Sequence, residues 1–351
     1  MSNSTRTSTL ADAPPTIRDV AQAAGVSVGT ASKALNGQGK LREETRGRVQ
    51  AAAAQLGFRA NSLAQSLHSK RSFTVGLISS DNYGRFSIPL LEGLEGALGS
   101  ARLSVFLCNA ADDPERERQH VESLLSKRVD GIIVTSRRTD ARAPLDLLGA
   151  HVPLLYAYAQ TETPGALCLL PDDEGGGRLA VEHLVGLGRR RVAHVTGPEH
   201  FEAVRLRRDA YLKVLAEHGL EAPAGGLLHG PWSEAWGREA VGRLLAGREA
   251  VDAIFCGSDQ IARGVADALL ERGVRVPGDI ALVGFDNWEI VAAATRPPLT
   301  TIDMDLRELG HQAAAQMLTL IEGRAERGVR RLPCTLIVRE SCGALKEGGG
   351  E

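Results

Sequence analysis

The 351-residue sequence lacks the signatures of several large classes of protein. No apolar stretch approaches the ~20 residues that a membrane-spanning helix needs. The polar first 15 residues lack the apolar centre of a signal peptide. The five cysteines are scattered along the chain, without the paired spacing of a zinc finger or a redox site. We therefore expect a cytoplasmic protein with reduced cysteines, no bound metal and no membrane partner.

The sequence also lacks the motifs of common enzymes. HExxH and the phosphate-binding P-loop are absent, and the GxSxG stretch at Gly25–Gly29 follows a helical pattern rather than a strand, so it is not a nucleophile elbow. Gly175–Gly177 follow the acidic pair Asp172–Asp173, so they make a poor phosphate cradle. Gly186 and Gly188 lack the third glycine of a dinucleotide fingerprint, which argues against a dehydrogenase. We therefore expect neither an enzyme nor a cofactor.

What the sequence does contain is a short helical module near its beginning. A first helix is predicted from one apolar face at helical spacing, formed by Ile17, Val20, Ala21 and Ala24. Gly25 then allows a tight turn, because glycine adopts positive φ without a steric cost. Ser27 can cap a second helix over about Val28–Leu35. Two short helices joined by such a turn are typical of a helix-turn-helix, whose second helix enters the major groove of DNA.

A third helix completes this module. We expect it over about Glu44–Leu56, ended by Gly57, with a core-facing side formed by Val49, Ala53 and Leu56. The predicted DNA-binding domain therefore spans residues 16–58, after a disordered N-terminus of residues 1–15.

Positive charge is concentrated on the same segment. Between Thr16 and Arg71 there are nine basic and three acidic residues, a net charge of +6. The whole chain carries −2 and residues 1–15 sum to zero, so the remainder carries −8. An acidic protein with one basic terminal domain has the charge distribution of a phosphate-binding module.

These stretches carry a resemblance to a known family. The run TIRDVAQAAGVSVGTASKALNG, followed by EETRGRVQAAAAQLGFRANSLAQSL, resembles the lac-repressor/galactose-repressor family of bacterial transcription regulators. The likeness continues through DDPERERQHVESLLSKRVDGIIV, DDEGGGRLAVEHLVGLG, SDQIARGVADALLERGVRVPGDIALVGFDN and RPPLTTIDMD, from Thr16 to about Ser341. It implies a small all-α helix-turn-helix domain joined to an α/β periplasmic-binding-protein-like core of two parallel-sheet subdomains.

The resemblance also implies which residues of the module contact DNA. Val28, Gly29 and Lys33 stand where the family's recognition helix meets bases, and Lys33 can donate to guanine N7 and O6. Alternatively, Val28 packs inward and Lys33 contacts only phosphate. Gly29 departs from the pattern, because glycine offers no side chain for base readout. The other DNA-binding residues expected here, chiefly contacts to the DNA backbone, are Thr16, Ser27, Thr30, Ser32 and Asn36.

Residues 59–72 match the hinge helix and linker of the family. The matching DNA-binding positions are Asn61, Ala64, Leu67 and His68. In that picture Leu67 from each subunit wedges into the minor groove and kinks the duplex. Alternatively, Leu63 and Leu67 pack two hinges together. Ala60 stands where many members carry proline, so this hinge lacks the backbone restraint that proline would give.

From Phe73 onward the pattern becomes strand–helix alternation, which favours parallel sheets covered by helices. About ten such strand–helix units exceed one doubly wound sheet, so we expect two similar subdomains. The resemblance implies that subdomain one comprises about 73–171 plus 298–327, and subdomain two about 172–297 plus 328–341. Residues 342–351 are expected to form a flexible tail.

Ligands of such folds bind where the carboxyl ends of the strands meet. Arg207 matches the family's effector arginine, able to fork onto hydroxyls or a carboxylate, and Asp286 its acidic ligand residue. The other expected effector contacts are Phe86, Ser87, Tyr158, Trp232 and Ser258. Arg85, the neighbour of Phe86, belongs to the same lip of subdomain one. Tyr158 replaces an acidic residue found in some members. The alternatives are a surface salt bridge for Arg207, a turn for Asp286, and core packing for Trp232 and Phe86.

The sequence thus predicts a homodimeric regulator that binds a palindromic operator. Its expected role is repression of carbohydrate uptake or catabolism genes, controlled by a sugar-like effector bound between the core subdomains. A transport receptor would share the core but needs a signal peptide and no DNA-binding module.

Overall fold

The computed structural model describes residues 15–35, 39–58, 71–247, 249–324 and 326–344. The chain divides into two compact units, residues 1–72 and 73–351, which are considered separately below. The second unit begins at Phe73, where strand–helix alternation begins in the sequence. No helix among the described residues is long and apolar enough to cross a membrane.

The first unit contains three helices, α1 (Ile17–Ala23), α2 (Val28–Leu35) and α3 (Glu43–Gln55). Their small core is formed by Val20, Ala21, Ala24, Ala31, Ala34, Val49, Ala52 and Ala53. Gly25 has φ +64°, and Ser27 Oγ accepts a hydrogen bond from the Thr30 N–H at 3.1 Å. The predicted turn and cap are therefore confirmed.

One predicted core residue of this unit is wrong. Leu56 is 38% exposed, whereas Ala52 and Ala53 are buried beside Val49. Helix α3 ends at Gln55, and Gly57 takes φ +64°, so the chain turns back at Leu56. Phe58, the next apolar residue, packs against the core in its place.

Gly29 lies in the interior of α2, where its missing side chain weakens the helix. A Cβ at this position would meet only Ser27 Oγ, at an ordinary 3.9 Å. We expect Gly29→Ala to stabilise the DNA-binding unit by about 1 kcal/mol, because alanine loses less backbone freedom on folding. Urea denaturation of the isolated segment and of full-length protein, followed by circular dichroism, measures this. A destabilised variant would mean that the α2 backbone is not helical there.

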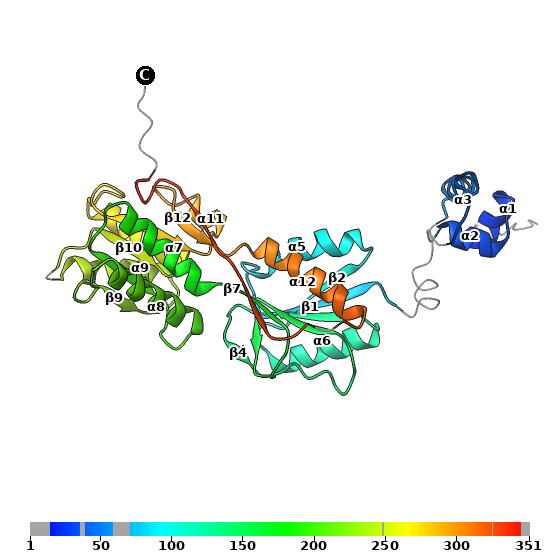
Figure 1. Ribbon diagram of the computed structural model, residues 1–351, viewed down its shortest axis with the longest axis horizontal. Helices are drawn as coiled ribbons and strands as arrows, with labels where there is room; N and C mark the ends of the chain where they lie inside the picture. The colour runs from blue at the N-terminus through cyan, green and yellow to red at the C-terminus, as the bar shows by residue number, and fades with distance from the viewer. Residues whose placement is uncertain (1–14, 36–38, 59–70, 248, 325, 345–351) are drawn as a thin grey trace, which may run out of the picture. The chain divides into compact units, whose positions relative to one another are not determined.

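The second unit is built on two six-stranded sheets and one two-stranded pair, β4 (Ala141–Arg142) with β6 (Gln160–Thr161). The first sheet is wholly parallel in the order β13-β7-β5-β3-β1-β2. Its strands are β1 (Thr74–Ser79), β2 (Ser104–Asn109), β3 (Gly131–Thr135), β5 (Leu154–Ala157), β7 (Cys168–Pro171) and β13 (Val329–Leu332). Figure 1 shows α5 (Ser87–Ser100) and α12 (Leu306–Ile321) on one side of it and α6 (Pro114–Ser126) on the other.

The second sheet has the order β14-β12-β11-β10-β8-β9, and only β14 runs antiparallel. Its strands are β8 (Val192–Thr196), β9 (Leu227–His229), β10 (Ala253–Cys256), β11 (Ala281–Phe285), β12 (Thr300–Asp303) and β14 (Thr335–Ile337). The helices of this subdomain are α7 (Asp173–Gly186), α8 (Glu202–Glu217), α9 (Glu234–Leu245), α10 (Asp259–Glu271) and α11 (Glu289–Ala292). Phe255 packs in the cluster with α7 and α8, and its neighbours Ile254 and Cys256 pack with α9 and α10, which is the alternation expected of a covered strand.

Glycines allow two helix pairs to touch backbone to backbone. A Cβ on Gly93 of α5 would overlap the Arg307 carbonyl of α12, and one on Gly310 would overlap the Leu90 carbonyl. Gly264 of α10 meets the Glu234 carbonyl of α9 in the same way. Larger residues there would force these helices apart.

The structure corrects the predicted subdomain boundaries at 298 and 328. Strand β12 pairs with β11 in the second sheet, so the chain crosses after Asp303. Strand β13 pairs with β7 in the first sheet, so the last crossing follows Leu332. The first subdomain is therefore 73–171 plus about 304–332, and the second comprises about 172–303 and the segment from 333. Both strands lie directly at a crossing, and the choice of sheet depends on partners more than 15 residues away.

The five cysteines all lie among the described residues, and none forms a disulfide. Cys168, Cys256, Cys334 and Cys342 are buried, and Cys108 is half-buried. The expectation of reduced residues in the core is confirmed for these four.

Candidate functional site

Helix α2 presents one side to the core of its unit and the other to solvent. Ala31 and Ala34 are buried, whereas Val28 is 43% exposed and Gly29 and Lys33 are exposed. The alternative in which Val28 packs inward is therefore wrong. The outward side carries the three residues predicted to read bases, and their contact with DNA stays a prediction.

The hydroxyl groups expected to meet DNA phosphates already have partners at the starts of α1 and α2. Thr16 donates its Oγ1 and its backbone N–H to Asp19 Oδ2, both at 2.7 Å. Ser27 Oγ lies 2.9 Å from Thr30 Oγ1 as well as capping α2. Ser32 is half-buried on the same helix. Asn36 and the hinge residues Asn61, Ala64, Leu67 and His68 lie outside the described residues.

The second unit holds a cleft of about 550 Å³ between its two sheets. Its walls are the loops that follow β1, β3 and β5 on one side and β8, β9, β10 and β11 on the other, together with the start of α8. The cleft thus lies outside the carboxyl ends of the parallel strands, where open α/β folds bind ligands, and its volume falls in the usual range of ~300–1,000 Å³.

Six of the seven predicted effector residues line this cleft, namely Phe86, Tyr158, Arg207, Trp232, Ser258 and Asp286. Ser87 does not. Its backbone N–H donates to Asp81 Oδ2 at 3.0 Å and its hydroxyl at 3.2 Å, and the residue is buried. Ser87 therefore fixes the loop after β1 rather than facing the cleft.

Arg207 is part of a buried ion pair, so the alternative of a surface salt bridge is wrong. Its side chain is 4% exposed, and that of its partner Asp173 is 0% exposed. Nε and Nη2 donate to Asp173 Oδ1 at 2.8 and 2.5 Å, and Nη1 donates to the Gly257 carbonyl at 2.7 Å. The guanidinium also lies 3.5 Å from the centre of the Phe285 ring. Three of its five N–H donors are thus used, and among the described residues the other two have no protein acceptor and are left for a ligand.

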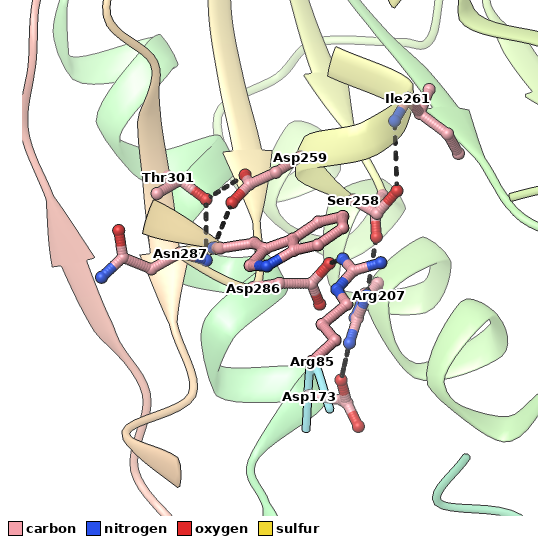
Figure 2. Close-up of polar contacts among 11 residues, drawn as sticks. Arg85, Asp173, Arg207, Ser258, Asp259, Ile261, Asp286, Asn287 and Thr301 are labelled. Carbon is pink, nitrogen blue, oxygen red and sulfur yellow. Dashed lines mark hydrogen bonds and ion pairs between the residues drawn. The ribbon is translucent and has the colours of Figure 1, made fainter. Parts of the chain in front are cut away.

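Asp286, which follows β11 on the same side of the cleft as Arg207, is held in a strained backbone conformation. Its φ is 108°, which a residue with a side chain rarely adopts and which is typical of binding sites. Figure 2 shows its carboxylate beside Arg85, with Asp259 and Thr301 above it in the view. Asp259 accepts from Thr301 Oγ1 at 2.5 Å and from the Trp288 N–H at 2.7 Å. Burial, and then the nearby Asp286 carboxylate, raises the pKa of Asp259 to about 8, and burial raises the pKa of Asp286.

Aromatic side chains gather around the cleft. The chain has only 14 of them, and six line the cleft: Tyr83, Phe86, Tyr158, Phe201, Trp232 and Trp288. The Phe86 and Tyr158 rings stack with centres 4.7 Å apart, and Trp232 lies against Gly197, whose missing side chain makes room for it. Such rings offer flat apolar faces of the kind on which the C–H face of a sugar packs.

Sequence reasoning missed several residues of the cleft. Arg137, Arg138 and Asp140 directly follow a predicted strand, so their position at its carboxyl end was a usable signal. Trp288 lies two residues after Asp286, and the scarcity of aromatics in the chain could have singled it out. Phe201 had no comparable signal. No group of three or more metal-ligating side chains occurs among the described residues.

Comparison with known proteins finds relatives along nearly the whole chain. Residues 16–61 match the bacterial regulatory proteins of the lacI family, and residues 181–342 match a periplasmic binding protein-like domain. The ribose operon repressor of Escherichia coli (strain K12) is 33% identical over 301 residues, which cover 85% of this chain and 90% of that protein. The HTH-type transcriptional repressor PurR of Haemophilus influenzae (strain PittEE) is 32% identical over 335 residues, covering 93% and 98%. The solved Lac repressor dimer, bound to operator and the anti-inducer ONPF, has a TM-score of 0.74 at 30% identity, covering 94% and 99%.

Proposed function

The chain belongs to the lacI family of bacterial regulatory proteins, and from that premise we propose that it represses carbohydrate uptake or catabolism genes in response to a sugar-like effector bound in its cleft. Its relatives are DNA-binding transcription regulators and not enzymes. Such a regulator acts where the DNA is, in the cytoplasm and at the nucleoid when bound to its operator.

The observation that carries the effector proposal is the composition of the cleft. Asp286 supplies a charged acceptor for paired hydroxyl groups, and Arg207 has two unused N–H donors on the same side. Trp232 and Phe86 add flat apolar surface from opposite subdomains. Hydrogen-bonding groups around aromatic faces suit a polyhydroxylated ring better than a phosphate or a long acyl chain.

We further propose that the protein acts as a homodimer on a palindromic operator, because a two-fold protein implies a two-fold site and the solved Lac repressor is a dimer bound to operator. Large apolar side chains are exposed on both subdomains. They are Phe106 and Leu107 on β2, Leu270 at the end of α10 and Ile290 on α11. Exposed apolar groups of this kind are suited to an interface. Movement of the subdomains on effector binding would then alter the spacing of the two hinges, a coupling that is typically ~1–3 kcal/mol.

A thermal-shift screen of ribose, hexoses, disaccharides and nucleosides tests the effector proposal. A sugar present at ~100 times its dissociation constant should stabilise the native state by about 2.7 kcal/mol and raise Tm by several degrees. We expect Asp286→Asn to weaken that sugar about 10- to 100-fold, because a charged acceptor is replaced by a neutral group.

The matched control is Arg178→Ala, which removes an exposed ion pair between α7 and α8, away from the cleft, and should bind the sugar normally. Sugar binding that survives Asp286→Asn and Trp232→Ala unchanged would place the effector elsewhere. A response to nucleosides with none to sugars would overturn the sugar assignment.

A further inference from the structure

The loop after β1 sends one side chain across the cleft to the other subdomain. Arg85 Nη2 donates to Asp286 Oδ2, so the residue expected to receive the effector is already occupied by a group of the chain itself. The side chains are only 13% and 6% exposed. Figure 2 shows the two side chains meeting end to end. We call this contact the cleft latch.

Aromatic rings from both subdomains hold the Arg85 guanidinium. Its central carbon lies 4.9 Å from the centre of the Phe86 ring and 4.8 Å from that of Trp288. The Arg85 guanidinium therefore occupies the carboxylate and the aromatic faces to which a polyhydroxylated ring would bind. The Nε of Arg85 is buried and has no hydrogen-bond partner among the described residues, so this N–H donor is not used in the latch.

Both ends of the latch are fixed by their own backbones. Asp81 accepts the N–H groups of Phe86 and Ser87 at 2.7 and 3.0 Å and that of Tyr83 at 3.2 Å, which shapes the loop that carries Arg85. Asp286 is held at its unusual φ, with its N–H donated to the Ile302 carbonyl at 2.8 Å. The contact is therefore built by two ordered loops.

We propose that Arg85 is an internal competitor for the effector, binding Asp286 in the ligand-free protein and holding the two subdomains closed until a ligand takes over that carboxylate. This inference rests on the proposed function, because it assigns Asp286 to the effector. A displacing ligand must donate at least one hydrogen bond to Asp286 and present an apolar face to Phe86 and Trp288. Arg85, once released, offers its donors to the ligand's own oxygens.

The latch is not the sole bridge across the cleft. On another wall the Glu202 N–H donates to Asp140 Oδ1 at 2.8 Å, and Arg331 pairs with Glu202 at 2.9 Å. That pair is more exposed than the latch, and exposed pairs contribute little. Breaking a buried pair leaves a charge without its partner, so loss of the latch should shift the balance between closed and open forms more strongly.

Spin-label distance measurements on the full-length, ligand-free protein test the proposal. One label is placed at Ser123 on α6 and one at Lys213 on α8, both exposed, in a Cys108→Ser background diluted with unlabelled protein. We expect Arg85→Ala to raise the ratio of long-distance to short-distance populations roughly tenfold, which corresponds to about 1.4 kcal/mol. Arg178→Ala, which breaks an exposed pair within one subdomain, should leave the distribution unchanged.

Methylguanidinium chloride is the probe that separates a latch from a general loosening of the core. In Arg85→Ala it should occupy the place of the missing guanidinium and restore the short distance, whereas tetramethylammonium chloride at equal ionic strength should not. Asp286→Asn should open the protein without rescue by methylguanidinium, and the double variant should open no further than either single one.

Three results would overturn the proposal: an Arg85→Ala distribution equal to that of the wild type, opening that methylguanidinium does not reverse, or additive effects in the double variant. If Arg85→Ala fails to fold, Arg85→Met removes the charge while keeping the apolar stem. The distance measurements contain neither operator nor sugar. A negative result for the cleft latch therefore does not affect the sugar screen, and a negative sugar screen does not affect the distance result.

Discussion

Replacing Arg207 by leucine is expected to lower the free energy of unfolding of the core by about 3–5 kcal/mol. The substitution leaves the Asp173 carboxylate at 0% exposure without its counter-charge and removes the donor to the Gly257 carbonyl. A buried charge that loses its ionic partner keeps its full desolvation cost, whereas leucine recovers only part of it by apolar burial. Denaturant unfolding monitored by tryptophan fluorescence, with Tm from calorimetry, measures the loss.

Two further variants show whether the buried pair is the cause. Arg178→Ala breaks a pair in which both side chains are well exposed, so it should cost at most about 1 kcal/mol. Removing both partners, as in Arg207→Leu with Asp173→Leu, should restore part of the lost stability, because no charge is then left unpaired. If Arg207→Leu unfolds like the wild type, the ion pair is not formed in solution.

The buried pair changes how an effector experiment at this position is interpreted. Loss of response in Arg207→Ala would follow from a damaged core as readily as from a lost ligand contact. Arg207→Lys keeps the charge beside Asp173 but loses the planar fork, so it separates the two roles. Retained Tm with weakened sugar binding in this variant would support contact between Arg207 and the effector.

Operator affinity of the full-length protein is expected to fall by about 10³-fold or more between 50 and 200 mM salt. The reason is the net charge of +6 on residues 16–71 of each protomer, which displaces counterions from the DNA backbone. Gel shift or fluorescence anisotropy with a palindromic site obtained by in vitro selection measures the slope. Insensitivity to salt would contradict the DNA-binding assignment of this segment.

Lys33→Ala tests base readout within the same experiment. If Lys33 contacts guanine, the variant should lose about 1–3 kcal/mol per half-site on the selected operator and relax its sequence preference. If it contacts only phosphate, affinity should fall equally for all sequences and the salt slope should decrease by about one per protomer. A half-site probe should bind far more weakly than the palindrome if the protein is a dimer. Lys127→Ala, on the core, is the matched control.

Local patterns in the sequence predicted much of the fold. Helices α1 to α3 begin and end within about a residue of their predicted bounds, because capping, glycine turns and 3.6-residue periodicity are local properties. The strand–helix alternation of the core was predicted from its apolar runs, but the predicted bounds placed the segments that form β12 and β13 in the wrong subdomains. Strand pairing depends on distant partners, and both strands lie at crossings where either sheet is within reach. The prediction that Leu56 is buried was wrong for a related reason. The chain reverses at Gly57, so Leu56 does not lie on the core-facing side of the helix.

The candidate site divides in the same way. Motif position identified six residues that line the cleft, but it placed Ser87 there as well and gave no role to Arg85 beyond proximity. A motif gives the position of a side chain along the chain, and the direction in which that side chain points depends on its loop. Asp81 turns Ser87 away from the cleft, and no pattern near Ser87 announces this.

The sequence alone determined the class of this protein, because a helix-turn-helix depends on residues three or four positions apart and a basic module is defined by its composition. The tertiary structure decided how the charged residues are used. Arg207 meets Asp173 across 34 positions, and Arg85 meets Asp286 across 201. Contacts over such separations form only in the folded core, the first pair within the second subdomain and the second pair between the two subdomains. Burial then makes the loss of either partner costly. The chemistry of the cleft is therefore a property of the assembled core.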